Sequence, residues 1–263
     1  MAKILVQGCG DVGSAVAHVL FCAGHSVVLH DSPRPPHLRR HMAYANALFE
    51  GEAMLEGVLA KRVKAIDSLP IMAQCRRAVP VAAQEIESVR LALAPGVIVD
   101  ARMRKRRVPE SQRGSAKLVI GLGPNFCAGQ NADIAIETSW GERMGEIVRA
   151  GPTMALSGEP RDIGGYRRER FVYAAAGGTF RTDVVIGCHV AAGEAIGWIE
   201  GIAVHAPLTG ILRGLTHDGA EVEQGTKIVE IDPQSDVALL SGLGARPRRI
   251  AEGVLKAVEG AGA

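Results

Sequence analysis

The chain has 263 residues, a net charge of +2 at pH 7 and 4% aromatic residues, a length sufficient for one large or two modest domains with a sizeable core. The near-neutral charge and the shortage of aromatic side chains argue against a nucleic-acid partner, because neither phosphate attraction nor base stacking is well provided for. No apolar run approaches the roughly 20 residues that cross a bilayer, and the short run after Met-Ala-Lys is not a signal peptide, so no membrane partner is expected.

The opening stretch predicts a strand, a glycine-rich turn, a helix and a second strand. Residues 4–7 suit a buried strand, and Gly8-Cys9-Gly10-Asp11-Val12-Gly13 forms the pattern G-x-G-x-x-G. Apolar residues at helical spacing follow, and this predicted helix ends near Gly24. Residues 27–29 predict the second strand, with Asp31 at its end, about 20 residues after the glycines. This context favours a dinucleotide-binding turn.

A nucleotide would use this turn in two ways. Its phosphate would face the free N–H groups at the start of the helix, and Asp31 would accept hydrogen bonds from a ribose, while Arg34 leaves a 2′-phosphate as an alternative. Asp11 caps the same N–H groups but also repels an anion. The structural alternative is that the motif only closes a strand-to-helix turn. The candidate cofactor-binding residues here are Gly8, Gly10, Asp11, Val12, Gly13 and Asp31.

The next segment contains the first cluster of positive charge. Residues 32–36, Ser-Pro-Arg-Pro-Pro, cannot continue a helix or a central strand. Residues 37–50 predict a helix with one apolar face, and Arg39 and Arg40 lie in its first turn, where positive charge opposes the helix dipole. Two interpretations stay open: the two arginines form a solvated surface, or they hold an anionic ligand near the glycine-rich turn.

Alternating helical and strand patterns continue to residue 100. After strand-like residues 58–65, the chain reads as helix, strand, helix and strand over residues 69–77, 80–83, 85–93 and 97–100. This alternation predicts a parallel sheet with helices on its faces. The expected fold class is therefore α/β, with a Rossmann-like sheet in the first part of the chain.

A basic loop follows the predicted strand at residues 97–100. Open parallel sheets bind ligands beyond the carboxyl ends of their strands, which places Asp100, Arg102 and Lys105 where a ligand could reach them. A solvated loop of basic residues is the alternative, and a nucleic-acid contact has only this one short loop in its favour.

A second apolar strand also runs into a glycine-rich loop, over residues 118–129. Its backbone N–H groups are expected to face a ligand, and its candidate residues are Gly121, Gly123, Pro124 and Gly129. Cys127 in this loop is either a nucleophile or soft ligand, if its pKa is lowered, or a small packing residue. The five cysteines are odd in number and lack a C-x-x-C pair, which predicts reduced thiols in a cytoplasmic protein and no metal site.

The chain changes character after a stretch rich in Gly and Pro at residues 151–165. Residues 172–199 and 204–231 match each other at an offset of 32, which predicts two interlocked halves that close a small all-β unit. The repeated pattern resembles the biotinyl/lipoyl carrier domain. Such a carrier needs a lysine at the hairpin between its halves, and residues 198–202, Trp-Ile-Glu-Gly-Ile, contain none, so we expect a docking or structural unit.

The predicted organisation has three parts. Residues 1–165 form the Rossmann-like nucleotide- or cofactor-binding domain, residues 166–234 form the biotinyl/lipoyl-like barrel-sandwich domain without its attachment lysine, and residues 235–263 form a C-terminal helical segment. An apolar stripe at Ala251, Val254, Leu255 and Val258 predicts that this last helix packs back on one of the domains.

Taken together, several stretches resemble the YqeB family, a group of selenium-dependent molybdenum hydroxylase accessory, or molybdenum cofactor biosynthesis, proteins. The stretches are GCGDVGSAVA, PHLRRHMAYANALFEGE, VIVDARMRKR, LVIGLGPNFCAG, IAIET, SGEPRDIGGYRRERFVYAAAGG and VHAPLTGILRGL. The chain has Asn125 where this family usually has glycine. The resemblance implies that the functional residues are Gly8, Gly10, Asp11, Asp100, Arg102, Lys105, Gly121, Gly123, Pro124 and Gly129.

The resemblance implies an accessory protein that binds a nucleotide, of the NAD or molybdopterin dinucleotide type, and docks on a molybdenum hydroxylase as its client. Asp100, Lys105 and Cys127 are then the candidate catalytic residues, with Cys127 handling sulfur or selenium. The alternatives are an NAD-dependent oxidoreductase acting on a small molecule and a non-catalytic interaction scaffold. Assembly into a homo-oligomer stays open.

Overall fold

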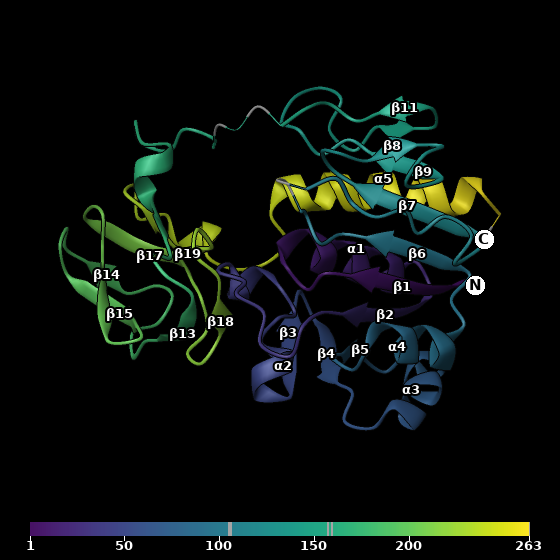
Figure 1. The fold of residues 1–263 in the computed structure, drawn as a ribbon, viewed down its shortest axis with the longest axis horizontal. Coiled ribbons are helices and arrows are strands. Elements are labelled where there is room, and N and C mark those ends of the chain that lie inside the picture. The colour runs from purple at the N-terminus through teal and green to yellow at the C-terminus, as the bar shows by residue number, and fades with distance from the viewer. Residues whose placement is uncertain (105–106, 157, 159, 263) are drawn as a thin grey trace.

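The computed structural model describes residues 1–104, 107–156, 158 and 160–262. Within these residues a nine-stranded sheet has the order β10-β9-β7-β6-β1-β2-β5-β4-β3 (Figure 1). Its strands are β1 Lys3–Gln7, β2 Ser26–His30, β3 Glu52–Leu55, β4 Val58–Arg62, β5 Val79–Ala82, β6 Val97–Asp100, β7 Leu118–Leu122, β9 Ile134–Ile136 and β10 Ile147–Val148. All neighbours are parallel except β3 with β4 and β10 with β9, at the two edges.

Helices cover both faces of this sheet, because its central strands are apolar on both sides. In β1, Ile4 and Val6 belong to the core under helices α1 (Asp11–Cys22) and α5 (Ala245–Gly260), whereas Leu5 faces the opposite core. That second core lies under α3 (Leu69–Cys75) and α4 (Ile86–Leu93). The C-terminal helix packs along α1, so the predicted return of this helix onto one of the domains is confirmed.

The expected helix over residues 37–50 is wrong. The structure has a short 3-10 turn, η1 (Arg40–Met42), and a single helical turn, α2 (Ala47–Glu50). The segment before them is held by long-range contacts: the backbone N–H of Leu215 donates to the carbonyl of Leu38 at 2.8 Å. Tertiary hydrogen bonds have therefore overridden the local periodicity.

The second part of the chain forms two four-stranded sheets whose strand neighbours are antiparallel, in the orders β12-β19-β17-β14 and β16-β15-β13-β18 among the described residues. The strands are β12 Phe171–Tyr173, β13 Gly178–Arg181, β14 His189–Val190, β15 Ala195–Ile199, β16 Ile202–His205, β17 Gly210–Leu215, β18 Glu221–Val222 and β19 Lys227–Asp232. Each sheet takes two strands from each repeat, so the interlocking of the two halves is confirmed. Phe180 with Leu212, and Ile196 with Ile228, occupy equivalent fully buried positions 32 residues apart.

Short elements complete the chain. They are β8 Cys127–Ala128, which pairs with β11 Gly151–Pro152, and the 3-10 turns η2 Ile66–Ser68, η3 Arg168–Arg170 and η4 Val237–Leu239. In the part of the chain that the structure describes, no helix has the length and apolar character needed to cross a bilayer. The division at residues 165 and 234 stays a prediction.

Candidate functional site

The carboxyl ends of β1 and β6 meet where the strand order changes direction. From β1 the chain moves to β2 on one side of the sheet, and β6 later pairs with β1 on the other side. Open α/β sheets bind ligands at this kind of position. Gly8 follows β1 with a φ of +106°, and a Cβ there would lie 2.8 Å from the carbonyl oxygen of Ala101. The glycine-rich turn and the loop after Asp100 are therefore in direct contact.

The place expected for a ribose is occupied by the protein's own side chains. Asp31 Oδ2 accepts a hydrogen bond from the backbone N–H of Cys9 at 2.6 Å and another from Nε2 of His37 at 2.7 Å. The imidazole of His37 also lies over Gly10, where an added Cβ would be 3.2 Å from its Nδ1. A side chain at position 10 would therefore be in tight contact with the imidazole of His37, which would have to shift by a few tenths of an ångström.

The Asp31–His37 pair is electrostatically strong. Burial by itself would raise the pKa of Asp31 and lower the pKa of His37. The charge and hydrogen bond that each gives the other outweigh burial, so the pKa of Asp31 falls and the pKa of His37 rises. Burial and the charge of Asp31 hold the pKa of Cys9 well above its ordinary value, which keeps this thiol protonated.

The two arginines of the same segment contact the second part of the chain. Arg39 donates to Glu230 of β19 through Nε at 2.7 Å and Nη2 at 3.0 Å, and through Nη1 to Asp11 at 3.2 Å. Arg40 donates through Nε to the carbonyl of Leu215 at 2.7 Å. Asp11 in turn accepts from the N–H of Val12 at 2.9 Å. Neither arginine is simply a solvated surface group, and the start of α1 is capped by its own carboxylate.

Glu230 is the centre of a buried charge cluster. It is fully buried and also accepts from Nη1 of buried Arg170 at 2.7 Å, with Nη1 of Arg213 at 3.6 Å. Burial favours a high pKa, but the charges of Arg39 and Arg213 and the hydrogen bonds from Arg39 and Arg170 lower the pKa of Glu230 to about 2. The cluster joins α1 to β19 through Arg39.

Asp100 is also fully buried and organises the loop after β6. It accepts from the backbone N–H of Arg102 at 3.2 Å and from its Nε at 3.0 Å, from Arg104 at 3.1 Å and from Gln112 at 3.0 Å. Glu110 completes the network with bonds to both arginines, at 2.9 Å and 2.6 Å. Lys105, predicted from the sequence as a catalytic residue, lies outside the described residues.

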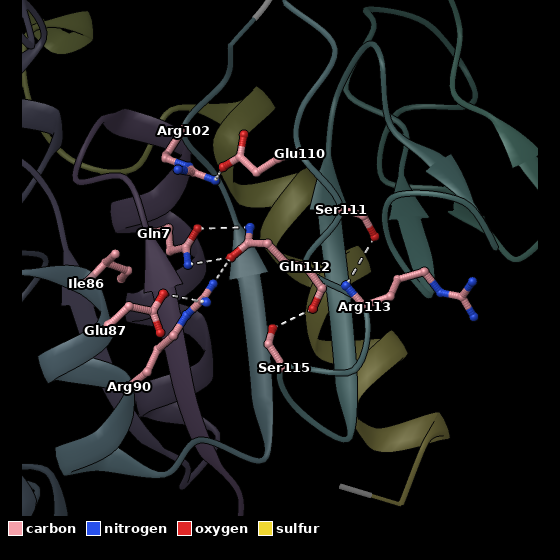
Figure 2. Close-up of a pocket in the computed structure, with 10 residues that line it drawn as sticks. All are labelled: Gln7, Ile86, Glu87, Arg90, Arg102, Glu110, Ser111, Gln112, Arg113 and Ser115. Atoms are coloured by element: carbon pink, nitrogen blue, oxygen red, sulfur yellow. Dashed lines mark hydrogen bonds and ion pairs between the residues drawn. The ribbon is translucent and has the colours of Figure 1, made fainter.

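A cavity of about 250 Å³ opens beside this network, on the α4 face of the sheet (Figure 2). At its floor the amides of Gln7 and Gln112 donate to each other, at 2.8 Å and 3.1 Å. Arg90 of α4 donates to Gln112 and, at 2.9 Å, to Glu87, while its Nε is buried and has no hydrogen-bond partner among the described residues. The residues with long polar side chains that line the cavity include Gln7, Arg90, Arg102, Glu110, Gln112 and Arg113, and Glu87, Ser111 and Ser115 line it as well.

Sequence reasoning identified Arg102 but missed five others: Gln7, Arg90, Glu110, Gln112 and Arg113. Gln7 carried a usable signal, because it is a polar residue at the last position of a buried strand that leads into a glycine motif. Arg90 and Gln112 carried none, since the first reads as a helix surface residue and the second as part of a loop.

The second glycine-rich loop borders this cavity through Arg113. Arg113 donates to the carbonyl of Gly129 at 2.5 Å and to Asp133 at 2.8 Å. Cys127 is half-buried, and its N–H donates to the side chain of Asn131 at 2.8 Å. In the described part of the chain no hydrogen bond or ion pair connects Cys127 with Asp100 or with the cavity residues. The three candidate catalytic residues are therefore not shown as one constellation.

Local packing and backbone conformation explain why this loop has glycine at several positions. A Cβ on Gly121 would overlap the ring of buried Phe126, and one on Gly123, which has a φ of +92°, would lie 2.8 Å from Oγ1 of Thr138. Gly129 has a φ of +86°. Asn125, between Pro124 and Phe126, has a φ of +72°, and asparagine tolerates this left-handed conformation better than other non-glycine residues. The loop is shaped by packing, and its expected contact with a ligand stays a prediction.

Among the described residues, no group of three or more His, Cys, Asp or Glu side chains is placed to hold a metal ion.

The chain is similar to one curated protein over nearly its whole length. It is 35% identical over 256 residues to the uncharacterized protein YqeB of Escherichia coli (strain K12), which covers 97% of this chain and 47% of YqeB. The chain therefore spans about half the length of the curated relative it matches. This similarity supports the resemblance to the YqeB family found in the sequence. No protein-family model matches the chain.

Similarity to solved structures is weak. A succinylglutamate desuccinylase/aspartoacylase from Rhodobacter sphaeroides has 16% identity and a TM-score of 0.24, covering 65% of this chain and 44% of that one. The apo form of the ectoine utilization protein EutE (DoeB) from Ruegeria pomeroyi has 10% identity and a TM-score of 0.25, covering 88% and 86%. At these values the similarity carries no argument about fold or function.

Proposed function

Because the chain is similar to YqeB over nearly its whole length, we propose that it is an accessory protein for the maturation of a molybdenum hydroxylase, as the family resemblance implies. In this proposal the first part is a Rossmann-like domain that binds a nucleotide or a molybdopterin-type cofactor. The second part is a biotinyl/lipoyl-like unit without an attachment lysine, and it docks on the client enzyme.

The cavity beside Gln7 and Arg90 is the observation that supports ligand binding. Arg90, Arg102 and Arg113 bring three positive charges to its lining, against the two carboxylates Glu87 and Glu110. Arg102 and Arg104 are neutralised from the solvent side by Glu110, whose side chain is 59% exposed. A phosphate could take the place of that carboxylate without a new buried charge.

The size of the cavity limits what it can hold. At about 250 Å³ it is below the range of roughly 300–1,000 Å³ typical of sites for drug-sized ligands. It therefore suits the phosphate end of a nucleotide or a small anion better than a whole dinucleotide. The Gln7–Gln112 amide pair supplies donors and acceptors for a polar group next to that phosphate.

Binding is tested by melting experiments with AMP, CMP and inorganic phosphate as probes. A ligand at 100 times its dissociation constant should stabilise the folded state by about 2.7 kcal/mol, measurable as a rise in Tm. Arg90→Gln should weaken binding about tenfold, because it removes a charge that lines the cavity. The exposed Arg77 lies outside the cavity, and Arg77→Gln is the matched control that should bind as the unmodified protein does.

Two results together would contradict the proposal. One is a Tm that none of the probes changes. The other is protein purified from cells that make molybdopterin in which mass spectrometry finds no bound small molecule.

A non-catalytic scaffold is the second candidate, favoured by the occupation of the first glycine-rich turn by His37 and Asp31. A scaffold would form a stable complex with a hydroxylase subunit in the absence of any small molecule. Co-purification of ligand-free protein with such a subunit separates this candidate from the first.

A further inference from the structure

The segment of residues 32–40, here called the strap, contacts the glycine-rich turn through His37, which lies over Gly10, and through Arg39, which binds Asp11. The backbone carbonyl of Leu38 accepts from the N–H of Leu215 in β17 at 2.8 Å. The side chain of Arg40 donates to the carbonyl of Leu215 at 2.7 Å. Arg39 binds Glu230 of β19. The strap is thus fastened to the second part of the chain, while its His37 side chain reaches back to the turn.

His37 makes the two contacts that a ribose would make at this position: a hydrogen bond to the acidic residue and close packing on the glycine. In dinucleotide-binding turns the acidic residue at the end of the second strand accepts hydrogen bonds from ribose hydroxyls, and a glycine allows close approach. Here Asp31 is that acidic residue, and it accepts from Nε2 of His37 at 2.7 Å. The imidazole lies against Gly10, 3.2 Å from the position of a Cβ.

We propose that the strap is an internal competitor, which keeps a nucleoside-phosphate site over the Gly8–Gly13 turn closed by placing the imidazole of His37 where a ribose would lie. Displacing the strap exchanges one donor to Asp31 for another, so the hydrogen-bond count at Asp31 is unchanged. The nucleoside binds only the open fraction of molecules, and its apparent affinity falls by that fraction.

The strap also determines what opens the site. Because it is bonded to β17 and β19, a movement of the second part of the chain away from α1 would carry His37 off Gly10. Asp11 would lose Arg39 in the same movement, since Arg39 binds both Asp11 and Glu230. This inference rests on the proposed binding of a nucleotide by the first part of the chain, but it names a different site from the cavity at Arg90, which lies on the α4 face of the sheet.

The test is the affinity for ADP, measured by isothermal titration calorimetry on the full chain. His37→Ala should bind ADP at least tenfold more tightly than the unmodified protein, because the competitor is gone. In the double variant His37→Ala/Gly10→Ala this gain should disappear, because the added methyl group occupies the surface on which the nucleoside would lie. His37→Gln, a flexible side chain whose amide nitrogen can reach the position of Nε2 and still donate to Asp31, should give an intermediate affinity and serves if His37→Ala does not fold.

Several outcomes would overturn the inference. A folded His37→Ala protein that binds ADP no better than the unmodified protein shows that His37 has only a packing role. A gain that survives Gly10→Ala places the ligand elsewhere. Adding Arg90→Gln to His37→Ala should leave the gain intact, and loss of the gain would mean that ADP binds the cavity at Arg90 instead.

Discussion

Replacing Glu230 with glutamine should lower the free energy of unfolding by about 3–5 kcal/mol, the range for breaking a buried ion pair from one side. Glu230 is fully buried and accepts from Arg39 and Arg170, and Arg170 is itself 2% exposed. A neutral amide leaves the buried guanidinium of Arg170 without its compensating charge, whereas Arg39, which is 29% exposed, keeps its ion pair with Asp11. Urea unfolding followed by circular dichroism measures the change.

The matched control for this substitution is Glu146→Gln. Glu146 also binds an arginine, Arg143, at 2.6 Å, but both side chains are about half exposed, at 47% and 54%. Exposed pairs contribute roughly 0–1 kcal/mol, so this control should unfold nearly as the unmodified protein does. Equal effects of the two substitutions would mean that the cluster around Glu230 does not stabilise the fold.

The pH dependence of stability gives an independent check on Glu230. Its pKa is lowered from an ordinary value of 4.5 to about 2 in the folded protein, where burial is outweighed by the arginines. A carboxyl group with a lowered pKa stabilises the fold fully above its unfolded pKa, and this stabilisation is lost as the pH falls through the folded value. The unmodified protein should therefore lose stability between about pH 4.5 and 2 more steeply than Glu230→Gln.

Replacing Gly13 with alanine should destabilise the protein by about 2 kcal/mol. A Cβ at this position would overlap the backbone carbonyl oxygen of Gly8, which follows β1 and has little freedom to shift. Overpacking of this kind costs about 1–3 kcal/mol, and the better helix propensity of alanine returns up to about 1 kcal/mol. The clash prevails because its partner is backbone and not a flexible side chain. Chemical denaturation measures the loss.

Gly96→Ala is the control for the general effect of adding a methyl group. The nearest atom to a Cβ at Gly96 is the carbonyl oxygen of Lys3 at 3.9 Å, which is ordinary contact. Alanine there should be neutral or slightly stabilising, by up to about 1 kcal/mol. If Gly13→Ala is as stable as Gly96→Ala, α1 does not pack against the end of β1 as closely as described.

The parts of the fold that were predictable are those whose residues carry a local pattern. β1, α1 and β2 followed from a short apolar strand, a glycine motif and helical spacing, and the repeat followed from matching residues 32 apart. The hairpin of β3 and β4 was only half predicted, because residues 52–55 have no clear alternation. The prediction of a helix over residues 37–50 was wrong for another reason: Leu38, Arg39 and Arg40 form hydrogen bonds with strands about 175 to 190 residues later in the chain.

The parts of the candidate site that the sequence predicted are the glycine-rich turn, the strand ends and the side chains of Asp31, Asp100 and Arg102. Strand ends and glycines located the edge of the sheet where Asp100 and Gly8 lie. The cavity floor depends on Gln7 meeting Gln112, which is 105 residues away along the chain. The competitor role of His37 depends on a segment whose path is determined by the second part of the chain. Side-chain pairing over such separations leaves no periodic signal for a single sequence to reveal.

The bond network that runs from Asp11 through Arg39 to Glu230 has a practical consequence for dissecting this protein. A fragment that stops near residue 165 would keep Arg39 but lose its main acceptor, and a fragment that starts there would keep Arg170 and Glu230 but lose the guanidinium of Arg39 that pairs with Glu230. Neither piece would carry a balanced set of charges. Expression plans, crystallisation trials and client-binding assays are therefore best built on the intact polypeptide.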